Sequence, residues 1–134
     1  MSHYDVIIIG AGTAGLNARR AAKSNGAKKV VMIDGGPLGT TCARVGCMPS
    51  KLLISAANAN YGVKKARMFG IQTQDPIVND KAVLERVRFE RDRFVGFVME
   101  GIDNVPEEEL IREYAEFIDD HTVKLSGGRI LSAE

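Results

Sequence analysis

The stretch that decides the fold lies at residues 4–15 and reads Tyr4-Asp-Val-Ile-Ile-Ile-Gly10-Ala-Gly12-Thr-Ala-Gly15. Residues 4–9 are rich in β-branched side chains and apolar at successive positions, which predicts a strand covered on both faces. A helix is predicted over 16–24, ended by Asn25-Gly26, and a second β-branched strand over 29–33. The sequence therefore predicts a strand–turn–helix–strand unit of the length that dinucleotide-binding domains use.

Each glycine of the turn has a predicted role in that unit. Gly10 makes the tight turn, Gly12 lets the main chain approach a pyrophosphate, and Gly15 lets helix and strand pack closely. The phosphates are expected at the positive N-terminal end of the helix. Asp34 follows the second strand, at about the spacing of the acid that accepts a hydrogen bond from a ribose hydroxyl. A glycine-rich turn used only for packing is the alternative.

Both cysteines of the chain, Cys42 and Cys47, lie within Gly39-Thr-Thr-Cys-Ala-Arg-Val-Gly-Cys-Met-Pro-Ser-Lys51. The residues from 51 onward are predicted to be helical, which places the pair near N-terminal helix amides that favour a thiolate. Five positions along an undistorted helix separate two Cα atoms by roughly 8.7 Å, whereas a disulfide needs them within about 6.8 Å. A bridge between the two sulfurs therefore requires a bend, which Gly46 permits.

Such a bridge would be a poor structural brace, because closing so short a loop stabilises a fold by only about 2 kcal/mol. It would also be strained, and strained disulfides are the easily reduced ones. We therefore interpret the pair as a redox couple. Two unrelated free cysteines are one alternative. Half of a zinc site is another, disfavoured because the only histidines, His3 and His121, are single and far apart. No metal site is predicted.

The position of the cysteine pair also bears on the cofactor. The pair follows directly on the dinucleotide-binding unit, where the far end of a bound dinucleotide could lie. A flavin ring exchanges electrons with a neighbouring disulfide, whereas a nicotinamide more often needs a separate hydride acceptor. The sequence therefore favours a flavin dinucleotide over a nicotinamide dinucleotide at this unit.

Composition narrows the range of partners and compartments. Of the 134 residues, 18 are lysine or arginine and 17 are aspartate or glutamate, which favours neither nucleic acid nor an anionic membrane as a partner. The longest apolar run is too short to span a bilayer and lacks the basic region of a secretory signal. Two close cysteines without an export signal predict catalytic sulfur in a reducing, cytoplasmic setting.

The remainder of the chain predicts two long helices and a small β extension. The helices are expected at 51–68 and 79–101, separated by a loop at 70–76 and followed by a turn at 106–109. Three short strands are expected at 112–118, 122–125 and 129–131. The predicted fold class is α/β, with a parallel sheet and a small antiparallel extension.

The stretch from Gly39 to Lys51 resembles the active-site signature of the pyridine nucleotide–disulfide oxidoreductases, flavoproteins that include dihydrolipoamide dehydrogenase, glutathione reductase and mercuric reductase. Its ending, Pro49-Ser50-Lys51, is most similar to the first and third of these. The opening from 4 to 34 is also similar to this family. The resemblance thus covers the first half of the chain.

The resemblance implies a Rossmann-like FAD-binding domain that is incomplete here. Residues 1–134 would be its N-terminal part, without the NAD-binding domain and the C-terminal interface domain. The full-length parent would be an FAD-dependent disulfide oxidoreductase similar to dihydrolipoamide dehydrogenase, using NAD and forming a homodimer, and the fragment alone would lack turnover. Alternatives are an enzyme similar to mercuric or glutathione reductase, or a stand-alone nucleotide-binding module with a thiol switch.

The resemblance also implies roles for individual residues. A substrate dithiol would attack a Cys42–Cys47 disulfide at Cys42, expected to be the more exposed sulfur, and Cys47 would donate to the flavin. Lys51 would stabilise negative charge near the flavin. The residues implied in cofactor binding are Gly10, Gly12, Gly15, Asp34, Gly35, Gly39, Thr41, Cys42, Lys51, Tyr114 and Ala115. Of these, Tyr114 and Ala115 match a segment whose backbone lies against adenine in the family.

Three positions depart from the family pattern. Thr40 stands where the family usually has a second glycine before the cysteine. Asp34 stands where the ribose acid is usually glutamate, one methylene longer. Glu113 stands where glycine is usual before the two residues that match the adenine-binding segment. These departures bear on affinity and on the adenine contact more than on family.

Overall fold

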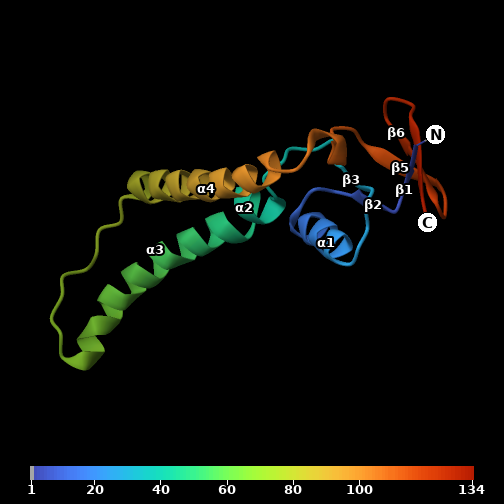
Figure 1. Ribbon diagram of the computed structural model, residues 1–134. Helices are drawn as coiled ribbons and strands as arrows, with labels where there is room; N and C mark the ends of the chain where they lie inside the picture. Colours follow the sequence, from blue (N-terminus) through green and yellow to red (C-terminus); the bar gives the residue numbers. More distant parts are fainter. Residues whose placement is uncertain (1) are drawn as a thin grey trace. The chain divides into compact units, whose positions relative to one another are not determined.

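A computed structural model describes residues 2–134 of the chain, which form two compact units (Figure 1). The first unit combines the two ends of the chain, up to Thr40 and from Val98 onward, and the second runs from Thr41 to Phe97. The predicted nucleotide-binding turn lies in the first unit and the cysteine pair in the second.

A parallel three-stranded sheet lies at the centre of the first unit. Its strand order is β2 (Val6–Ile9), β3 (Val30–Ile33) and β4 (Leu110–Ile111), with Val6 opposite Val30 and Met32 opposite Leu110. All residues of β3 are buried. Helix α1 (Thr13–Ser24) connects β2 to β3, and Asn25 caps its C-terminus before Gly26 at φ +96°. The predicted strand–turn–helix–strand unit is therefore confirmed.

The two faces of β3 explain why its apolar residues succeed one another without alternation. Val30 and Met32 pack with Ile8 and Ala11 in one buried cluster, to which Leu16 of α1 contributes. Val31 and Ile33 pack in a second cluster, whose other buried members are Val123, Leu125 and Leu131. Burying a side chain of this size contributes about 1.5–3 kcal/mol. A strand covered on both faces therefore needs an apolar residue at every position.

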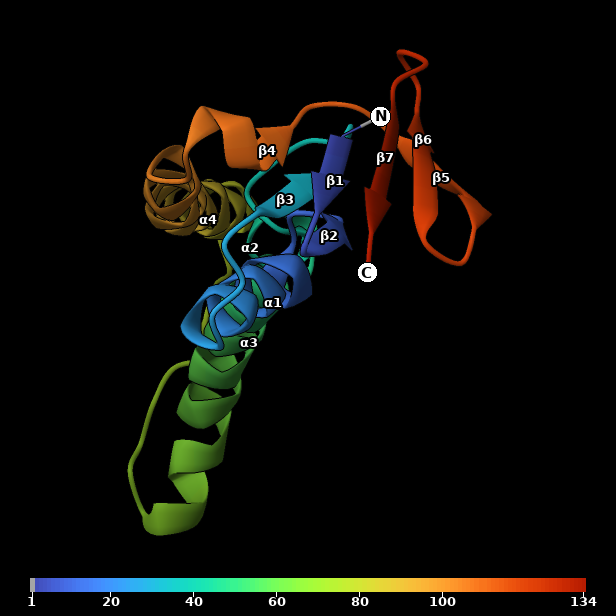
Figure 2. The same ribbon diagram turned by 45° about the vertical axis from the view of Figure 1, so that its right-hand side comes forward.

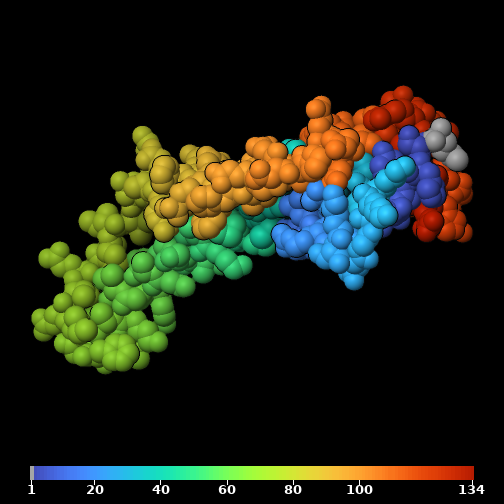
Figure 3. Space-filling view, in the orientation of Figure 1, coloured from blue at the N-terminus to red at the C-terminus, as the bar shows by residue number. Residues whose placement is uncertain are grey.

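The second sheet of this unit is mixed. Its strand order is β1 (Ser2–Tyr4), β7 (Ile130–Ala133), β6 (Thr122–Leu125) and β5 (Ala115–Asp119). The last three pair antiparallel, whereas β1 pairs parallel to β7 (Figure 2). In Figure 3 the dark-blue N-terminal strand lies beside the red C-terminal strands of the same unit. The predicted antiparallel extension is thus present, with one parallel strand added.

The boundaries of three predicted strands are wrong. The stretch 4–9 belongs to two strands in two sheets, because Asp5 interrupts the strand. The Asp5 carboxylate accepts the backbone N–H groups of Lys28 and Lys29 at 2.7 and 3.0 Å. The strand expected at 112–118 is replaced by β4 and β5, with a bend between them. The strand expected at 129–131 is β7, displaced toward the C-terminus.

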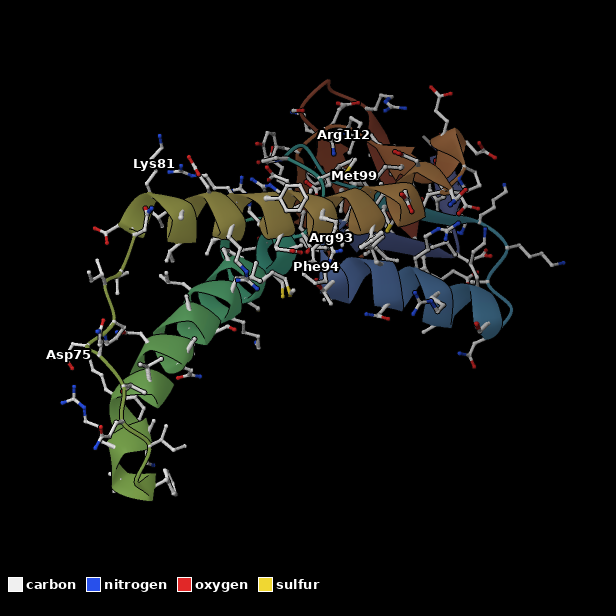
Figure 4. All side chains as sticks on the ribbon, turned by 90° about the vertical axis from the view of Figure 1, so that its left-hand side faces the viewer. Asp75, Lys81, Arg93, Phe94, Met99 and Arg112 are labelled. Atoms are coloured by element: carbon white, nitrogen blue, oxygen red, sulfur yellow. The ribbon has the colours of Figure 1, made fainter. Side chains whose placement is uncertain are left out.

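The second unit is helical. It holds α2 (Thr41–Val45), α3 (Cys47–Lys65), the 3₁₀ turn η1 (Ala66–Phe69) and most of α4 (Asp80–Asp103). Figure 4 shows Asp75 in the loop before α4 and Lys81 in its first turn, where the Asn79 side chain accepts the backbone N–H of Ala82 at 3.0 Å. Both long helices and the loop between them were predicted, but α3 begins earlier than expected, at Cys47.

Within residues 2–134, no helix is both long enough and apolar enough to cross a membrane.

Candidate nucleotide and dithiol sites

The glycine turn has the geometry that a pyrophosphate site needs. Gly10 has φ +100° and donates its N–H to the Ile33 carbonyl at 2.7 Å, which fixes the tight turn at the end of β2. A Cβ on Gly15 would lie 1.8 Å from the Gly10 carbonyl oxygen, so only glycine lets α1 approach the turn. The predicted roles of these two glycines agree with this geometry.

Gly12 lies between them and faces open space. A Cβ built there meets no atom within 4 Å, and the φ of −79° suits any residue. Gly12 is the N-cap of α1, without a side-chain cap and without an acidic residue in the first turn. The amides of a first helical turn have no partner within the helix and attract anions. The chain therefore forms an open cradle at the positive end of a helix, and this cradle fits a pyrophosphate group.

Asp34 connects this cradle to the end of β3. Its Oδ2 accepts the backbone N–H of Ala11 at 2.7 Å, and its Oδ1 accepts the backbone N–H of Gly36 at 2.8 Å. Each carboxylate oxygen has two lone pairs, so both keep capacity to accept a ribose hydroxyl. The structure thus gives Asp34 a bracing contact that the sequence did not predict, at the position predicted for the ribose acid.

The segment that follows β4 lies against the segment that follows β3. A Cβ on Gly35 would lie 2.7 Å from Cδ2 of Tyr114, so the tyrosine ring occupies the space above this glycine. Arg112 donates through Nη2 to the Gly36 carbonyl at 2.6 Å (Figure 4). Arg112 was not predicted as a site residue. Only the parallel pairing of β4 with β3 brings it there, and the sequence carried no local signal for β4.

In the predicted adenine-binding segment, the backbone of Tyr114 is engaged by Ser126. The Tyr114 N–H donates to Ser126 Oγ at 3.3 Å, and the Tyr114 carbonyl accepts the Ser126 N–H at 2.9 Å. Ala115 is the first residue of β5 and pairs with Leu125. The Tyr114 main-chain groups therefore serve the hairpin. Those of Ala115 do not bond to Leu125, whose N–H donates to the Arg129 carbonyl. The Tyr114 side chain is exposed.

The contacts of Glu113 explain why a carboxylate is tolerated where the family usually has glycine. It accepts the Gly127 N–H at 2.6 Å and pairs with Arg129 at 2.8 Å. The hydrogen bond from Arg129, followed by that from Gly127, lowers the pKa of Glu113. The Glu113 side chain thus connects the segment before β5 to the turn between β6 and β7.

The second unit holds the cysteine pair across a break between two helices. Gly46 separates α2 from α3 with φ −120° and ψ −110°, so the predicted bend at Gly46 is confirmed. A Cβ there would lie 3.1 Å from the Thr41 carbonyl oxygen. Both cysteines are free thiols in the structure, and the Cys47 side chain lies close enough to Cys42 to raise the pKa of its thiol. That the two sulfurs join in a disulfide stays a prediction.

The surroundings of Cys42 favour the protonated form of its thiol. The hydrogen bond with Cys47 and then burial raise the pKa of the Cys42 thiol, and the nearby Lys51 charge partly opposes this rise. The unit thus brings Cys42, Cys47 and Lys51 together. One expectation is wrong: Cys42 is half-buried and Cys47 is exposed, because Cys42 lies inside α2 whereas Cys47 follows directly on the bend.

The two residues before α2 turn the chain with left-handed backbones. Gly39 has φ +98° and Thr40 has φ +58°. Thr40 is also buried, with 8% of its surface exposed. The position where the family usually has glycine is therefore one where glycine would be the least strained residue. Thr41 is the first residue of α2.

Each half of the candidate site is thus complete within its own unit. That the cysteine pair lies at the flavin end of a groove beginning at the glycine turn stays a prediction. The roles assigned from the sequence stay predictions as well. In cofactor binding they concern Gly10, Gly12, Gly15, Asp34, Gly35, Gly39, Thr41, Cys42, Lys51, Tyr114 and Ala115, and in catalysis Cys42, Cys47 and Lys51.

Known proteins were compared with the chain by sequence. The mercuric reductase of Staphylococcus aureus is 36% identical over 96% of this chain and 23% of its own length. The glutathione reductase of Yarrowia lipolytica is 32% identical over 87% of this chain and 24% of its own length. The dihydrolipoyl dehydrogenase of Geobacillus stearothermophilus is 32% identical over 92% of this chain and 26% of its own length. The chain spans about a quarter of the length of these relatives.

The fold and the family agree with the site. The Cu(II) complex of the HOCl-induced flavoprotein disulfide reductase RclA from Escherichia coli superposes with a TM-score of 0.68 over 96% of this chain and 26% of that one, at 21% identity. The α/β fold predicted for a partial, Rossmann-like FAD-binding domain is therefore confirmed. The sequence model of the pyridine nucleotide-disulphide oxidoreductases matches residues 4–132. The chain belongs to the pyridine nucleotide-disulphide oxidoreductase family.

Proposed function

We propose that this chain supplies the nucleotide-binding turn and the dithiol–disulfide centre of an FAD-dependent disulfide oxidoreductase. The observation that carries the proposal is the break at Gly46 between α2 and α3, across which Cys47 lies close enough to Cys42 to raise the pKa of its thiol. A pair held in contact at a helix break can be oxidised and reduced without refolding of either helix. Lys51, in the first part of α3, adds positive charge beside it.

The residues of the first unit would hold the adenosine diphosphate half of FAD. The backbone from Gly10 to Gly15 forms the cradle for the phosphates, and Asp34 braces the cradle while its oxygens accept from a ribose. When bound, the flavin would supply a two-electron acceptor for the dithiol. NAD would bind to parts of the parent outside residues 1–134.

The pKa of Cys42 supports the direction of thiol exchange. A substrate thiolate attacks Cys42 Sγ of the disulfide, the Cys42–Cys47 bond breaks, and Cys47 leaves as a thiolate. The second substrate thiol then attacks the substrate sulfur of the mixed disulfide and releases Cys42, which takes up a proton. The order, attack at Cys42 with departure of Cys47, is the one that the family resemblance implies, and a raised pKa makes the Cys42 thiol a poorer leaving group than an ordinary cysteine.

We propose dihydrolipoamide as the dithiol, as the Pro49-Ser50-Lys51 ending suggests. A second candidate is a mercuric reductase activity, favoured by relatives of that name at 36% and 43% identity. Two adjacent thiolates are soft ligands that suit a soft metal ion. That the full-length parent forms a homodimer remains a prediction. A stand-alone nucleotide-binding module with a thiol switch remains the alternative function.

The nucleotide part is tested with Gly12→Ala. The new methyl group meets no protein atom, so folding should be unchanged, while the methyl fills the space where a phosphate would approach. Calorimetric titration with FAD and ADP should show at least a tenfold loss of affinity. Gly62→Ala, another glycine whose Cβ meets nothing within 4 Å, is the matched control. Equal affinities in the two variants would contradict the proposal.

The dithiol part is tested by trapping. In Cys47→Ser, lipoamide should form a mixed disulfide with Cys42 that intact-protein mass spectrometry detects. In Cys42→Ser, the corresponding adduct on Cys47 should form to a smaller extent, because the proposal assigns exchange with the substrate to Cys42. Mercuric ion bound with equal affinity by wild type and both single variants would argue against the second candidate. A thiol switch alone predicts equal affinity for ADP and FAD.

A further inference from the structure

A chain of three hydrogen bonds leads from the residue after β4 to the glycine turn. Arg112 Nη2 donates to the Gly36 carbonyl at 2.6 Å (Figure 4). The N–H of the same glycine donates to Asp34 Oδ1 at 2.8 Å, and Asp34 Oδ2 accepts the Ala11 N–H at 2.7 Å. Arg112 is therefore connected to the phosphate cradle through one glycine and one carboxylate.

The loop after β3 is attached at two points to the chain that leaves β4. The Asp34 N–H donates to the carbonyl of Ile111, the last residue of β4, at 2.9 Å. The bond from Arg112 to Gly36 extends this attachment two residues further along the loop. The Asp34 side chain lies between the two points, so its backbone on both sides is fixed.

This contact differs from those of an ordinary surface arginine. Arg112 is exposed, but its bond to Gly36 joins residues 76 positions apart, and a bond from a guanidinium is charge-assisted. Arg20 of α1 is also exposed, yet it donates to Asn17 Oδ1, three positions earlier on the same helix, at 3.0 Å. The Arg20 bond is local to one helix, whereas the Arg112 bond joins two segments at the ligand site.

The orientation of the Gly36 peptide matters for the ribose part of the site more than for the phosphate part. If this peptide turned, its N–H would leave Asp34 Oδ1, and the carboxylate would lose one of its two backbone donors. Groups that are already oriented bind a ligand more tightly than groups that must be ordered. The glycine turn itself is fixed separately, because the Gly10 N–H donates to the Ile33 carbonyl at 2.7 Å.

We propose that Arg112 is a positioning residue of the dinucleotide site. It holds the Gly36 peptide so that Asp34 keeps the orientation in which one carboxylate serves both the cradle and a ribose hydroxyl. This inference rests on the proposed function of the glycine turn. The competing explanation is that Arg112 is only a surface charge that attracts the nucleotide. Such an attraction is screened by salt and acts most strongly on the ligand with the most charge.

The two explanations predict different results for Arg112→Met. Calorimetric titration at low and at high salt should show ADP binding weakened about tenfold at both, and the affinity for inorganic pyrophosphate unchanged. A surface charge predicts instead a larger loss for pyrophosphate that disappears at high salt. Arg112→Lys keeps a donor for the Gly36 carbonyl and should recover most of the ADP affinity at high salt. Arg20→Met removes an equal charge from the same unit and should bind both ligands as wild type does.

A double-mutant cycle tests whether Arg112 acts through Asp34. Asp34→Ala removes both acceptors of the carboxylate, so the Gly36 peptide has nothing left to orient. The double variant Asp34→Ala/Arg112→Met should therefore bind ADP as weakly as Asp34→Ala alone. Losses that add in the double variant would overturn the positioning role. Thermal unfolding shows whether each variant is folded, and Asp34→Asn replaces Asp34→Ala in the cycle if the latter is not.

The outcomes separate this inference from the function on which it rests. If wild type binds ADP but Arg112→Met binds it equally well, or loses affinity only at low salt, the positioning role is overturned and the glycine cradle stands. If wild type binds neither ADP nor FAD, the proposed function fails and the positioning role fails with it.

Discussion

Asp34 Oδ2 accepts the backbone N–H of Ala11 at 2.7 Å and so ties the end of β3 to the middle of the glycine turn. Its other oxygen accepts the N–H of Gly36 at 2.8 Å. One carboxylate therefore fixes both the cradle and the loop that carries Gly35. The acid predicted to contact a ligand is also a part of the scaffold that shapes the ligand site.

Replacing Asp34 with asparagine should remove the acceptor of one of these two backbone N–H groups. Both backbone partners are donors, and an asparagine side chain has only one oxygen, so one N–H would face an amide NH₂ group. Asp34→Asn should lower the free energy of unfolding by about 1–3 kcal/mol and weaken ADP binding. Denaturant titration measures the first effect. Asp103→Asn, at the exposed end of α4, should be neutral, and an equal loss in both variants would exclude the bracing role.

The bend between the cysteines should respond to Gly46→Ala. The new Cβ would lie 3.1 Å from the Thr41 carbonyl oxygen, so the backbone has to shift toward a continuous helix, in which the two sulfurs lie farther apart. The equilibrium constant for forming the Cys42–Cys47 disulfide against glutathione should fall about tenfold, which is about 30 mV. Gly62→Ala within α3 should leave this constant unchanged.

The proton on Cys42 can be followed by the pH dependence of its alkylation. Its pKa is raised chiefly by the hydrogen bond with Cys47, so Cys47→Ala should lower the pKa and speed alkylation of Cys42 near pH 8. Lys51→Met removes a charge that lowers the pKa, so it should slow alkylation. Both are read by mass spectrometry after quenching. A faster reaction in Lys51→Met would show that the charge is not felt at Cys42.

The left-handed backbone at Thr40 predicts that a glycine variant is more stable there than an alanine variant, the reverse of the order inside a helix. Alanine at φ +58° keeps a strain of about 1–2 kcal/mol that glycine does not have. Thr40→Gly should therefore unfold at a higher denaturant concentration than Thr40→Ala, by about 1 kcal/mol. At Ser55, inside α3, the glycine variant should instead be the less stable of the two, by about 0.5–1 kcal/mol. The same order at both positions would rule out the strain at Thr40.

Glu109 should make the first unit sensitive to acid. It is 13% exposed, and although burial alone would raise its pKa, the hydrogen bonds from Lys23 and Arg19 of α1 lower it from the ordinary value of 4.5. A carboxyl whose folded pKa is depressed stabilises the fold above its unfolded pKa and loses this contribution as the pH falls through the folded pKa. Stability should therefore decline below about pH 4.5.

Glu109→Gln isolates this contribution. The variant should lose about 2 kcal/mol of unfolding free energy at pH 7, and its difference from wild type should shrink toward pH 3. Glu108→Gln, at an exposed position of the same turn, should show neither effect. A pH-independent difference for Glu109→Gln would mean that packing, and not charge, accounts for the loss.

Local patterns predicted the parts of the fold whose causes are local. The positive φ of Gly10, the close approach of Gly15 and the left-handed Gly26 after α1 all follow from residues that lack a Cβ. The buried β3 follows from its run of β-branched and apolar residues. The bend at Gly46 was predicted because the cysteine spacing fits no straight helix.

The errors have a common cause, which is pairing over long sequence distances. The run 4–9 has no local signal for division between two sheets, because the division arises where β1 pairs with β7 and β2 with β3. Strand β4 has only two residues, and its pairing with β3 makes it a strand. Arg112 was missed with it. The exposure of Cys42 depends on packing around α2 and could not be read from its place in the sequence.

What the sequence determined by itself is the chemistry: a glycine spacing that opens a helix end to phosphate, an acid after the second strand, and two cysteines too far apart for an undistorted helix. These features depend on residue type and spacing within one or two turns of chain. Tertiary structure decided which groups those residues meet, namely that Asp34 braces Ala11, that Tyr114 rests on Gly35, and that Cys47 raises the pKa of Cys42. The reason is that contacts between distant segments depend on how whole strands and helices pack, which no single stretch encodes.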